Sequence, residues 1–560
     1  MSLNLFTFVL FYFFIINSTI GYGYLATKIF KINYKFFNYS LLGLIGIFIL
    51  LIISYTSHLF IEHNFIHNSV ILVIGIISFS HLFFKERQKK NFLYINLFFL
   101  LLFISFVIFK SHDDFSYYHF PYTYYLTQSK IIFGIGNFNH GFRTPSSLFY
   151  LNSLFYLPII KYYFFHIGAI LIMGFTSYHF IDLIKKGLKH KKYDKFFFLS
   201  LLFFMFTLIF FYRIAEHGTD RSAQILVFLL IIELLVIINF NKDINENIIK
   251  ILIILGLVIS LKSFYILYLI LTFPVIYYFI IDKKFNNILL IFTSYFFYLF
   301  LFLFGSVLFV NFANSGCLIY PVSLTCFDYF SWSIPLKEVS DMNNWYEQWS
   351  KAGASPNFRV ENSQEYILHF NWVNNWFQEY FFTKVSDFIL GILFLILIFV
   401  ITFGSKKKNS LFVYRGEKFI YIIILILLFE WFYNHPSLRY GGYQLLCLAL
   451  FLPFSNFMSN LNHSKKIFLK TNILLIIALT IFFGRNINRL INENNKYDFD
   501  PFTNPVYRIT ANHFSAYNSL QEIVNNKFFC DSNVKQCANN TRLDVKKKFG
   551  YKVFSRKIIK

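Results

Sequence analysis

The chain has 560 residues, of which 57% are hydrophobic and only 14% are charged, and it contains 81 phenylalanines and 39 tyrosines. This composition excludes a soluble domain of this size and indicates a membrane protein with many spans. The formal net charge of +23 would suggest nucleic-acid binding in a soluble protein, but the basic residues lie mainly between the hydrophobic runs. There they suit contact with anionic membrane lipids and control of orientation, so we expect no nucleic-acid partner.

The apolar runs predict an all-α polytopic membrane protein with about fourteen transmembrane helices, because a run of about 17–25 apolar residues can cross a bilayer. The first run has no Lys or Arg before it and no small-residue cleavage site after it, so we expect a retained helix rather than a signal peptide. The predicted spans lie near residues 3–20, 39–57, 68–84, 92–109, 161–183, 196–212, 223–240, 248–261, 263–281, 287–310, 387–403, 418–433, 443–458 and 467–484.

These spans divide the chain into five parts. Residues 1–91 hold N-terminal transmembrane helices, 92–310 a membrane core that includes the loop 110–160, and 387–484 the C-terminal transmembrane helices. The loop 311–386 and the tail 485–560 lie between or after spans, and connecting segments this long are uncommon without a role. The tail ends in the strongly basic run TRLDVKKKFGYKVFSRKIIK, which we expect to lie on anionic lipid.

Lysine and arginine are concentrated in alternate loops, among them 28–35, 85–90 and 185–192. The short loops between them are poor in both residues. Under the positive-inside rule this alternation places both termini, the loop 110–160 and the loop 311–386 outside. We therefore expect a multi-pass protein of a bacterial inner membrane with both termini in the periplasm.

Four of the five cysteines form two close pairs in segments assigned to the outside. Cys317 and Cys326 lie in the loop 311–386, and Cys530 and Cys537 lie in the tail. This placement predicts two disulfides in an oxidising compartment, with reduced cysteines as the alternative. No histidine stands at ligand spacing beside either pair, which disfavours zinc. Cys447 lies in a predicted span, where we expect it to pack.

Tryptophan is concentrated in the same outside loop, which carries five of the six in the chain. Rings of this kind can stack on a sugar or rest in the lipid headgroup layer, and we favour the interfacial role. The five are Trp332, Trp345, Trp349, Trp372 and Trp376.

Two adjacent carboxylates, Asp113 and Asp114, open the loop 110–160 directly after an apolar run. An acidic pair at the mouth of a helix bundle is costly to keep, which favours a function, although a water-facing acidic turn is the alternative. Neighbouring side chains point in different directions, so one can face a reaction while the other fixes the loop. A carboxylate can deprotonate the acceptor hydroxyl in glycosyl transfer. With His112, the pair could instead hold a divalent cation such as Mg or Mn on a leaving phosphate.

Several isolated cations are predicted at the outer ends of spans. Lys262, in LKSFY, interrupts the apolar stretch 248–281 and predicts a tight turn at the depth of Asp113. Converging cations suit a phosphate leaving group, whereas snorkelling to lipid headgroups is the competing explanation. The other candidates for phosphate or substrate binding are His119, Arg143 in GFRTPSS, Arg221 in EHGTDRS and Arg439 in NHPSLRYGGY.

Four further acidic residues lie near or within predicted spans, and their roles are open at the level of sequence. Glu216 and Asp220 could supply a second acidic partner for substrate or metal, and a structural salt link to Arg213 or Arg221 is equally compatible with their spacing. Glu233 and Glu430 lie within predicted spans, as the acids of a proton-coupled transporter do. A polyisoprenoid or glycan transporter, or flippase, is therefore the alternative function, and an envelope scaffold is a third.

An outside acidic pair after an early span, a long loop behind it and a lone Lys at a later outer turn resemble the GT-C superfamily of integral-membrane glycosyltransferases, which includes protein O-mannosyltransferases and aminoarabinose transferases of lipid A. The motifs DDFSYYHFP, GIGNFNHGFRTPSSLFY, GCLIYPVSLTC and SLRYGGY are similar to those of an uncharacterised bacterial family of such proteins. The resemblance implies a polyprenyl-phosphate-linked sugar donor, a glycan, lipid or protein acceptor, and periplasmic transfer with inversion at the anomeric carbon.

By position, the resemblance makes Asp113 or Asp114 the base or metal carboxylate, Lys262 a contact to the donor phosphate, and Arg439 a second such contact. The chain departs from the pattern because three predicted spans precede the one that carries the acidic loop, where many members have none. The resemblance therefore implies a core that begins at the fourth helix.

Overall fold

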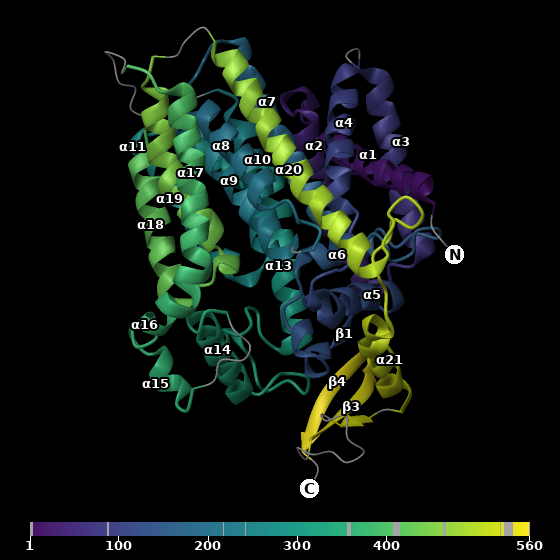
Figure 1. Cartoon of the computed structure of the whole chain (residues 1–560). Coiled ribbons are helices and arrows are strands. Elements are labelled where there is room, and N and C mark those ends of the chain that lie inside the picture. Colours follow the sequence, from purple (N-terminus) through teal and green to yellow (C-terminus); the bar gives the residue numbers. More distant parts are fainter. Residues whose placement is uncertain are drawn as a thin grey trace.

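The structure, a computed structural model, describes residues 4–86, 89–216, 218–240, 242–354, 360–406, 415–462, 466–526, 528–530 and 541–558. Most of these residues are helical, and the long helices run side by side in one bundle (Figure 1). Each of the fourteen apolar runs identified in the sequence is mainly helical. The chain is therefore a mainly helical, multi-pass membrane protein.

Eleven helical segments of the described chain are long and apolar enough to cross a bilayer. They are α1 (Leu5–Ile29), α2 (Tyr39–Phe60), α3 (Phe65–Lys85), α7 (Ile167–Lys189), α9 (Gly218–Asn239), α10 (Ile244–Leu261), η5 with α11 (Ser263–Ile281), α13 (Tyr295–Ser315), α16 through α17 (Val373–Phe403), α19 (Gly442–Ser459) and α20 (Ile467–Tyr497).

Three helices account for the difference between these eleven and the fourteen predicted spans. α4 (Lys90–Phe106) and α8 (Lys195–Phe210) are apolar, but they have only 17 and 16 residues, which is short for a crossing. α18 (Glu417–Asn434) carries Glu417, Lys418 and Glu430. The predicted span 287–310 is also divided, into α12 (Phe285–Thr293) and α13.

Small residues let the first three helices approach closely. A Cβ atom on Gly23 of α1 would lie 1.8 Å from the carbonyl oxygen of Leu42 in α2, and one on Gly21 would lie 2.0 Å from that of Gly75 in α3. Glycine at such positions allows backbone contact between membrane helices. These contacts make α1, α2 and α3 a packed unit beside the rest of the bundle.

Three segments that are distant in sequence gather at one end of the bundle (Figure 1). The first contains η2 (Phe115–His119), α5 (Phe120–Gln128), β1 (Ile132–Phe133), η3 (Ile135–Asn137), η4 (His140–Phe142) and α6 (Ser147–Ser153). The second contains η6 (Ser323–Thr325), α14 (Leu336–Lys351), α15 (Ser363–Ile367), α16 (Val373–Trp376) and η7 (Phe377–Val385). The third contains α21 (Ala511–Asn526), β2 (Phe528–Cys530), β3 (Thr541–Lys548) and β4 (Tyr551–Ile558). The first two are the predicted outside loops, and the third belongs to the predicted tail.

A small sheet ties the tail to the acidic loop and was not predicted from the sequence. Its strand order is β1-β4-β3-β2, with β1 parallel to β4 and the other pairs antiparallel. The strand β4, which lies in the basic run at the end of the tail, pairs with residues 132 and 133. Before the sheet, α20 continues as one helix to Tyr497, beyond the predicted end at residue 484.

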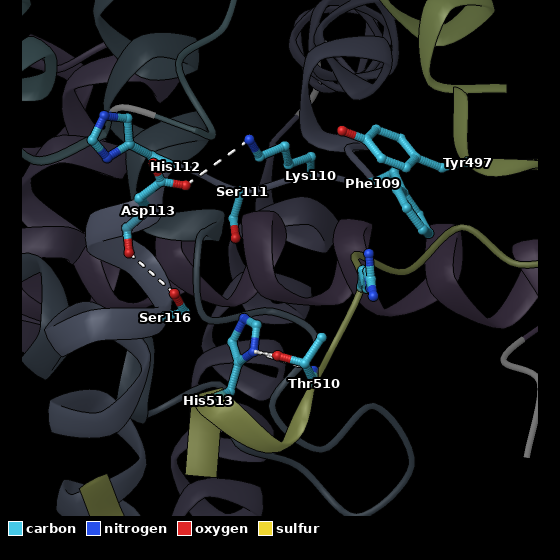
Figure 2. A pocket seen from close by; sticks show the side chains of 10 residues that line it. Phe109, Lys110, Ser111, His112, Asp113, Ser116, Tyr497, Thr510 and His513 are labelled. Atoms are coloured by element: carbon cyan, nitrogen blue, oxygen red, sulfur yellow. Dashed lines mark hydrogen bonds and ion pairs between the residues drawn. The ribbon is translucent and has the colours of Figure 1, made fainter. Parts of the chain in front are cut away.

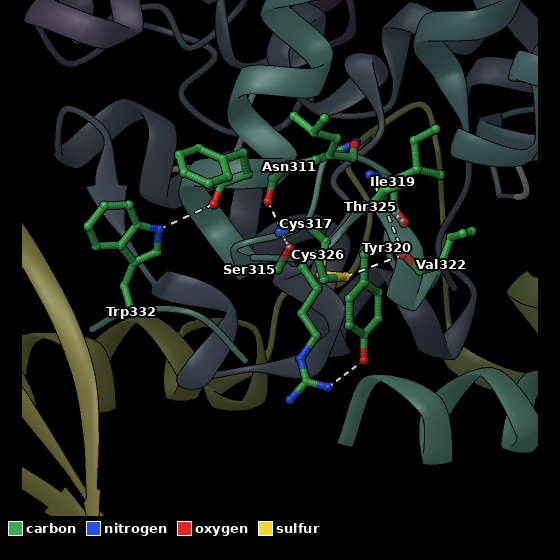
Figure 3. The surroundings of a disulfide bond; sticks show 12 residues. Asn311, Ser315, Cys317, Ile319, Tyr320, Val322, Thr325, Cys326 and Trp332 are labelled. Atoms are coloured by element: carbon green, nitrogen blue, oxygen red, sulfur yellow. Dashed lines mark hydrogen bonds between the residues drawn. A yellow bond between two sulfur atoms is a disulfide. The ribbon is translucent and has the colours of Figure 1, made fainter. Parts of the chain in front are cut away.

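A disulfide joins Cys317 and Cys326 just after α13, with the two Cα atoms 3.9 Å apart (Figure 3). Cys447 is a free, buried cysteine in α19. The second predicted pair lies outside the described residues, because the structure describes neither Cys537 nor the side chain of Cys530.

Candidate functional site

The two neighbouring aspartates of the acidic loop point to different places. Asp113 has a side chain that is 93% exposed, and its carboxylate lies 3.9 Å from the Lys110 ammonium. Asp114 precedes the π-helical turn η2, and its side chain is only 29% exposed. The backbone N–H of Asp114 donates to Nδ1 of His112 over 3.1 Å, which fixes the start of this turn. Asp114 is therefore the more buried of the two carboxylates.

Four charged side chains from separate elements form a continuous chain of ion pairs. Nη2 of Arg439 lies 3.3 Å from Oδ2 of Asp114, and Nε of Arg439 lies 3.3 Å from Oδ2 of Asp220. The Lys262 ammonium lies 3.0 Å from the other oxygen of Asp220. Arg439 thus bridges the two carboxylates, as the rigid fork of a guanidinium allows. We call Asp114, Arg439, Asp220 and Lys262 the charge cluster.

Helix ends bring the acid and the lysine of this cluster together. Asp220 lies in the first turn of α9, and Lys262 is the extended residue directly after α10, with φ −154° and ψ 141°. α9 and α10 are consecutive packed helices, so the start of one meets the end of the other. The hydroxyl of Ser147 in α6 donates to the Ser260 carbonyl over 2.6 Å and fixes this end of α10.

Arg439 is held by the short helix η8 (Leu438–Tyr440) between α18 and α19. Its carbonyl accepts a hydrogen bond from the Gln224 amide of α9 over 3.0 Å. Gly441 follows with φ 111°, a conformation that favours glycine. The guanidinium lies 5.7 Å from the ring centre of Trp349 in α14. A tryptophan of the loop 311–386 therefore supports the cluster by a cation–π contact.

A cavity of about 130 Å³ opens beside the charge cluster. Two side chains of the cavity have polar groups without partners among the described residues. Nε2 of His119 is buried and makes no hydrogen bond with them. Arg221 makes no hydrogen bond or ion pair with them either, although it packs over the ring of Phe211. Buried polar groups normally have partners, so the cavity is suited to a polar ligand. It is lined by His112, Asp114, His119, Glu216, Thr219, Asp220, Arg221, Arg439 and Tyr443.

Burial and charge set the ionisation of the groups outside the spans. Burial lowers the pKa of His119 to about 3, which leaves a neutral imidazole at pH 7. Burial alone would lower the pKa of Arg439, but Asp220, Tyr440, Tyr118 and Asp114 outweigh it and hold that pKa above its ordinary value. Burial also raises the pKa of Tyr440 to about 12. Arg439 therefore stays charged, while His119 and Tyr440 stay neutral.

Two of the predicted residues make salt links outside the charge cluster. Arg143 does not line this cavity: its guanidinium donates to the Gly136 carbonyl, to the hydroxyl of Tyr320 over 2.6 Å and to Glu338. Arg556 of β4 also donates to Glu338, over 2.7 Å. Arg143 thus joins the acidic loop, α14 and the tail. Glu216 forms the salt link to Arg213 that its spacing allowed.

The tryptophans divide between packing and exposure. Trp372 and Trp376 have 0% and 2% of their surface exposed, and their indole N–H groups donate to the carbonyls of His369 and Pro436. Trp345 is 44% exposed. The two buried rings are therefore placed neither for sugar stacking nor for an interfacial belt.

Two of the three predicted metal ligands, His112 and Asp114, lie together, whereas Asp113 pairs with Lys110. Nδ1 of His112 lies 3.5 Å from Oδ2 of Asp114. Within the part of the chain that the structure describes, no three His, Cys, Asp or Glu side chains gather closely enough to hold a metal ion.

The sequence around Asp220 and Trp349 does not reveal their contacts with the charge cluster. The spacing of AEHGTDRS suggested Arg213 or Arg221 as the partner of Asp220, yet its partners are Lys262 and Arg439. Only the packing of α9 against α10 and η8 creates these pairs. The signal for Trp349 was its place in the tryptophan-rich loop, which does not reveal which ring meets a cation.

A family model described as Domain of unknown function (DUF8201) matches residues 5–446. Neither the curated proteins nor the solved structures include a significant match to the chain. The matched range contains all four residues of the charge cluster.

Proposed function

The chain belongs to the family described as Domain of unknown function (DUF8201), and we propose that it is a membrane glycosyltransferase of the GT-C type. It moves a sugar from a polyprenyl-phosphate donor to a cell-envelope glycan, lipid or protein on the periplasmic side of the inner membrane. The observation that carries the proposal is the cavity beside the charge cluster, which Asp114, Arg439 and Arg221 all line and in which the Asp114 carboxylate pairs with Arg439 over 3.3 Å. An acid and cations in one cavity suit the two charge changes of glycosyl transfer.

In the proposed reaction, Asp114 acts on the acceptor. Its carboxylate accepts the proton of the acceptor hydroxyl while the oxygen of that hydroxyl forms a bond to the anomeric carbon. The bond from this carbon to the phosphate oxygen of the donor breaks at the same time, and the electron pair leaves with the phosphate. Attack opposite the leaving group inverts the anomeric centre. Partial exposure of Asp114 supports this role because the carboxylate must be accessible to a ligand.

The cations of the cavity stabilise the departing phosphate in this proposal. Arg221 is suited to bind it directly, since no described residue neutralises it through an ion pair. Arg439 contributes a permanent charge, and Lys262 acts through Asp220, which it holds 3.0 Å away. Fixed cations at a leaving group stabilise the charge that develops in the transition state. These cations supply positive charge at the leaving phosphate, and a Mg or Mn ion held by Asp113, Asp114 and His112 is the alternative source of such charge.

The experiment compares envelope lipids and glycans by mass spectrometry in a strain that lacks the gene. Wild-type protein is expected to restore a missing glycosylated product, and Asp114→Asn is expected to fail although it inserts normally. Asp341→Asn is the matched control, because Asp341 is an exposed acid of α14 outside the cavity. Full restoration by Asp114→Asn would refute the proposed role.

A specific observation also favours the second candidate, a transporter or flippase. Glu233 of α9 is 3% exposed, and its carboxylate lies 3.4 Å from His179 and 3.8 Å from Lys250. Buried ionisable groups in membrane helices often belong to proton relays. At 1.5 Å per residue, Glu233 lies roughly 20 Å along the helix from Asp220, so the two sites can be tested separately. A transporter would lose flux in Glu233→Gln, whereas the glycosyltransferase would keep its product.

A further inference from the structure

A second and larger cavity, of about 240 Å³, lies next to the acidic pair (Figure 2). His112 lines both cavities, whereas Asp114 lines the first and Asp113 the second. One wall of the second cavity is formed by residues 109–113 and Ser116. The other comes from the C-terminal part of the chain, namely Tyr497, Arg508, Thr510 and His513. The backbone N–H of Arg508 donates to the Phe109 carbonyl over 2.9 Å and joins the two walls.

The hydrogen bonds of His513 define its tautomer. The backbone N–H of Thr510 donates to Nδ1 of His513 over 3.2 Å, and the Thr510 hydroxyl lies 3.1 Å from the same atom. A backbone amide can only donate, so Nδ1 is the acceptor and the neutral ring carries its hydrogen on Nε2. Burial and the nearby Arg508 charge lower the pKa of His513, so the ring stays neutral at pH 7.

Nε2 of His513 is therefore a donor that lacks an acceptor. The residue is only 5% exposed, and this nitrogen has no hydrogen-bond partner among the described residues. Figure 2 shows the ring between Thr510 and the segment that carries Ser111 and Ser116. A buried donor without a partner is costly. A ligand oxygen bound in this cavity would accept a hydrogen bond from the Nε2–H of His513.

The charges of the cavity favour an anionic ligand. Lys110 and Arg508 line it with a single acid, Asp113. Lys110 is loosely paired with that acid, at 3.9 Å with both side chains well exposed, while the Arg508 guanidinium forms no ion pair with a described residue. Guanidinium and ammonium groups bind phosphate and carboxylate through charge-assisted hydrogen bonds.

We propose that this second cavity binds an oxyanion, a phosphate or carboxylate, through Arg508, Lys110 and the Nε2–H of His513. That the oxyanion belongs to the sugar acceptor rests on the proposed function, whereas the binding itself does not. The cavity shares His112 with the first, so an acceptor anchored here would present its hydroxyl next to Asp114. The second wall, with Tyr497, Arg508, Thr510 and His513, lies beyond residues 5–446. Recognition of the acceptor therefore uses a part of the chain outside the family match.

Binding is tested with the full chain in nanodiscs of zwitterionic lipid, with inorganic phosphate as the probe in a ³¹P NMR titration. All proteins carry Arg221→Ala, which removes the unpaired cation of the first cavity. Arg508→Ala is expected to weaken phosphate binding about tenfold, the loss of roughly 1.4 kcal/mol from one charge-assisted bond. His513→Phe is expected to weaken it severalfold while keeping the ring contacts to Phe115 and Phe120. Lys496→Ala, an exposed cation outside the cavity, is the matched control and is expected to leave binding unchanged.

A second set of nanodiscs contains anionic lipid and separates two sources of the oxyanion. If the anionic lipid competes with inorganic phosphate, and this competition is lost in Arg508→Ala, the natural oxyanion is a lipid headgroup. If the anionic lipid leaves phosphate binding unchanged, the natural oxyanion is a soluble or glycan-borne anion. Either result supports the site. Equal phosphate affinity in the parent, Arg508→Ala and His513→Phe proteins would overturn it, as would the absence of binding to phosphate and anionic lipid alike. Whether or not phosphate binds in the second cavity, Asp114→Asn is still expected to abolish sugar transfer. Failure of the oxyanion site can therefore be distinguished from failure of the proposed function.

Discussion

Arg439 and Asp114 are separated by 325 positions in the sequence, yet Nη2 of the arginine lies 3.3 Å from the carboxylate of the aspartate. The same guanidinium reaches Asp220 at the start of α9. Arg439 thereby connects the acidic loop, the first turn of a buried span and the turn before α19. The pairing gives Asp114 a fixed cation beside the place where the proposed reaction releases a phosphate, so the function of Arg439 can be tested directly.

Arg439→Ala is expected to lower the rate of sugar transfer about 100- to 1,000-fold, the usual effect of removing one fixed group that stabilises transition-state charge. Arg439→Lys is expected to recover only part of this loss, because one ammonium cannot bridge Asp114 and Asp220 as the fork does. Rates are measured as product formed per unit of membrane-inserted protein. Arg485→Lys, which alters an exposed arginine that donates to the Ile209 carbonyl, serves as control. Wild-type rates in Arg439→Ala would contradict the assigned role.

The link through Glu338 is expected to stabilise the acidic loop. Glu338 accepts hydrogen bonds from Arg143, which is 3% exposed, and from Arg556. Glu338→Gln leaves the buried Arg143 without its counter-charge, and we expect a loss of about 2 kcal/mol in the free energy of unfolding. Thermal unfolding of the detergent-solubilised protein measures it. Glu361→Gln, at an exposed position, should have no effect, and an equal effect of both substitutions would argue against the link.

Acid is expected to destabilise the fold through His119. Burial lowers the pKa of this side chain to about 3, whereas the unfolded chain titrates near 6.5. Between these values the unfolded chain binds a proton that the folded chain does not, so stability falls as the pH drops from about 6.5 toward 3. His119→Gln should therefore lose less stability than the wild type between pH 7 and pH 5. Identical pH profiles of the unfolding temperature would show that His119 is not buried as a neutral base.

The proposed orientation predicts which residues a membrane-impermeant thiol reagent reaches in intact cells. A cysteine at position 341, on exposed α14, is expected to react from outside, and one at position 191, in the lysine-rich turn after α7, only after the membrane is opened. The reason is the alternation of Lys and Arg between loops. If position 191 were labelled in intact cells and position 341 were protected, the orientation would be the opposite of the proposed one.

The helices could be predicted from the sequence because a membrane span is a local property of one apolar run, as for α2 and α9. Chemistry at residues 113 and 114 was also predictable in outline, since adjacent carboxylates beside a span are conspicuous. The choice between them was not, because it depends on the turn that His112 fixes at Asp114. The sheet escaped prediction for a similar reason. β1 has two residues and pairs with a strand near the C-terminus, so no local periodicity reveals it.

Long-range packing also decided which charges meet. Lys262 and Arg439 looked alike as lone cations at span ends, and both join Asp220. Arg143 looked equally suitable, but its neighbours Tyr320 and Glu338 come from the loop after α13, and they bind it away from the first cavity. Nothing in the residues around Arg143 distinguishes these outcomes.

The most direct measurement follows the donor itself. Purified protein is incubated with the lipid extract of cells that lack the gene, and mass spectrometry follows every polyprenyl-phosphate-linked sugar in the mixture. The wild type is expected to convert one such lipid to free polyprenyl phosphate as a glycosylated product appears, and Asp114→Asn is expected to leave it intact. Conversion by Asp114→Asn at the wild-type rate, or no consumption of any lipid-linked sugar by the wild type, would contradict sugar transfer at this site.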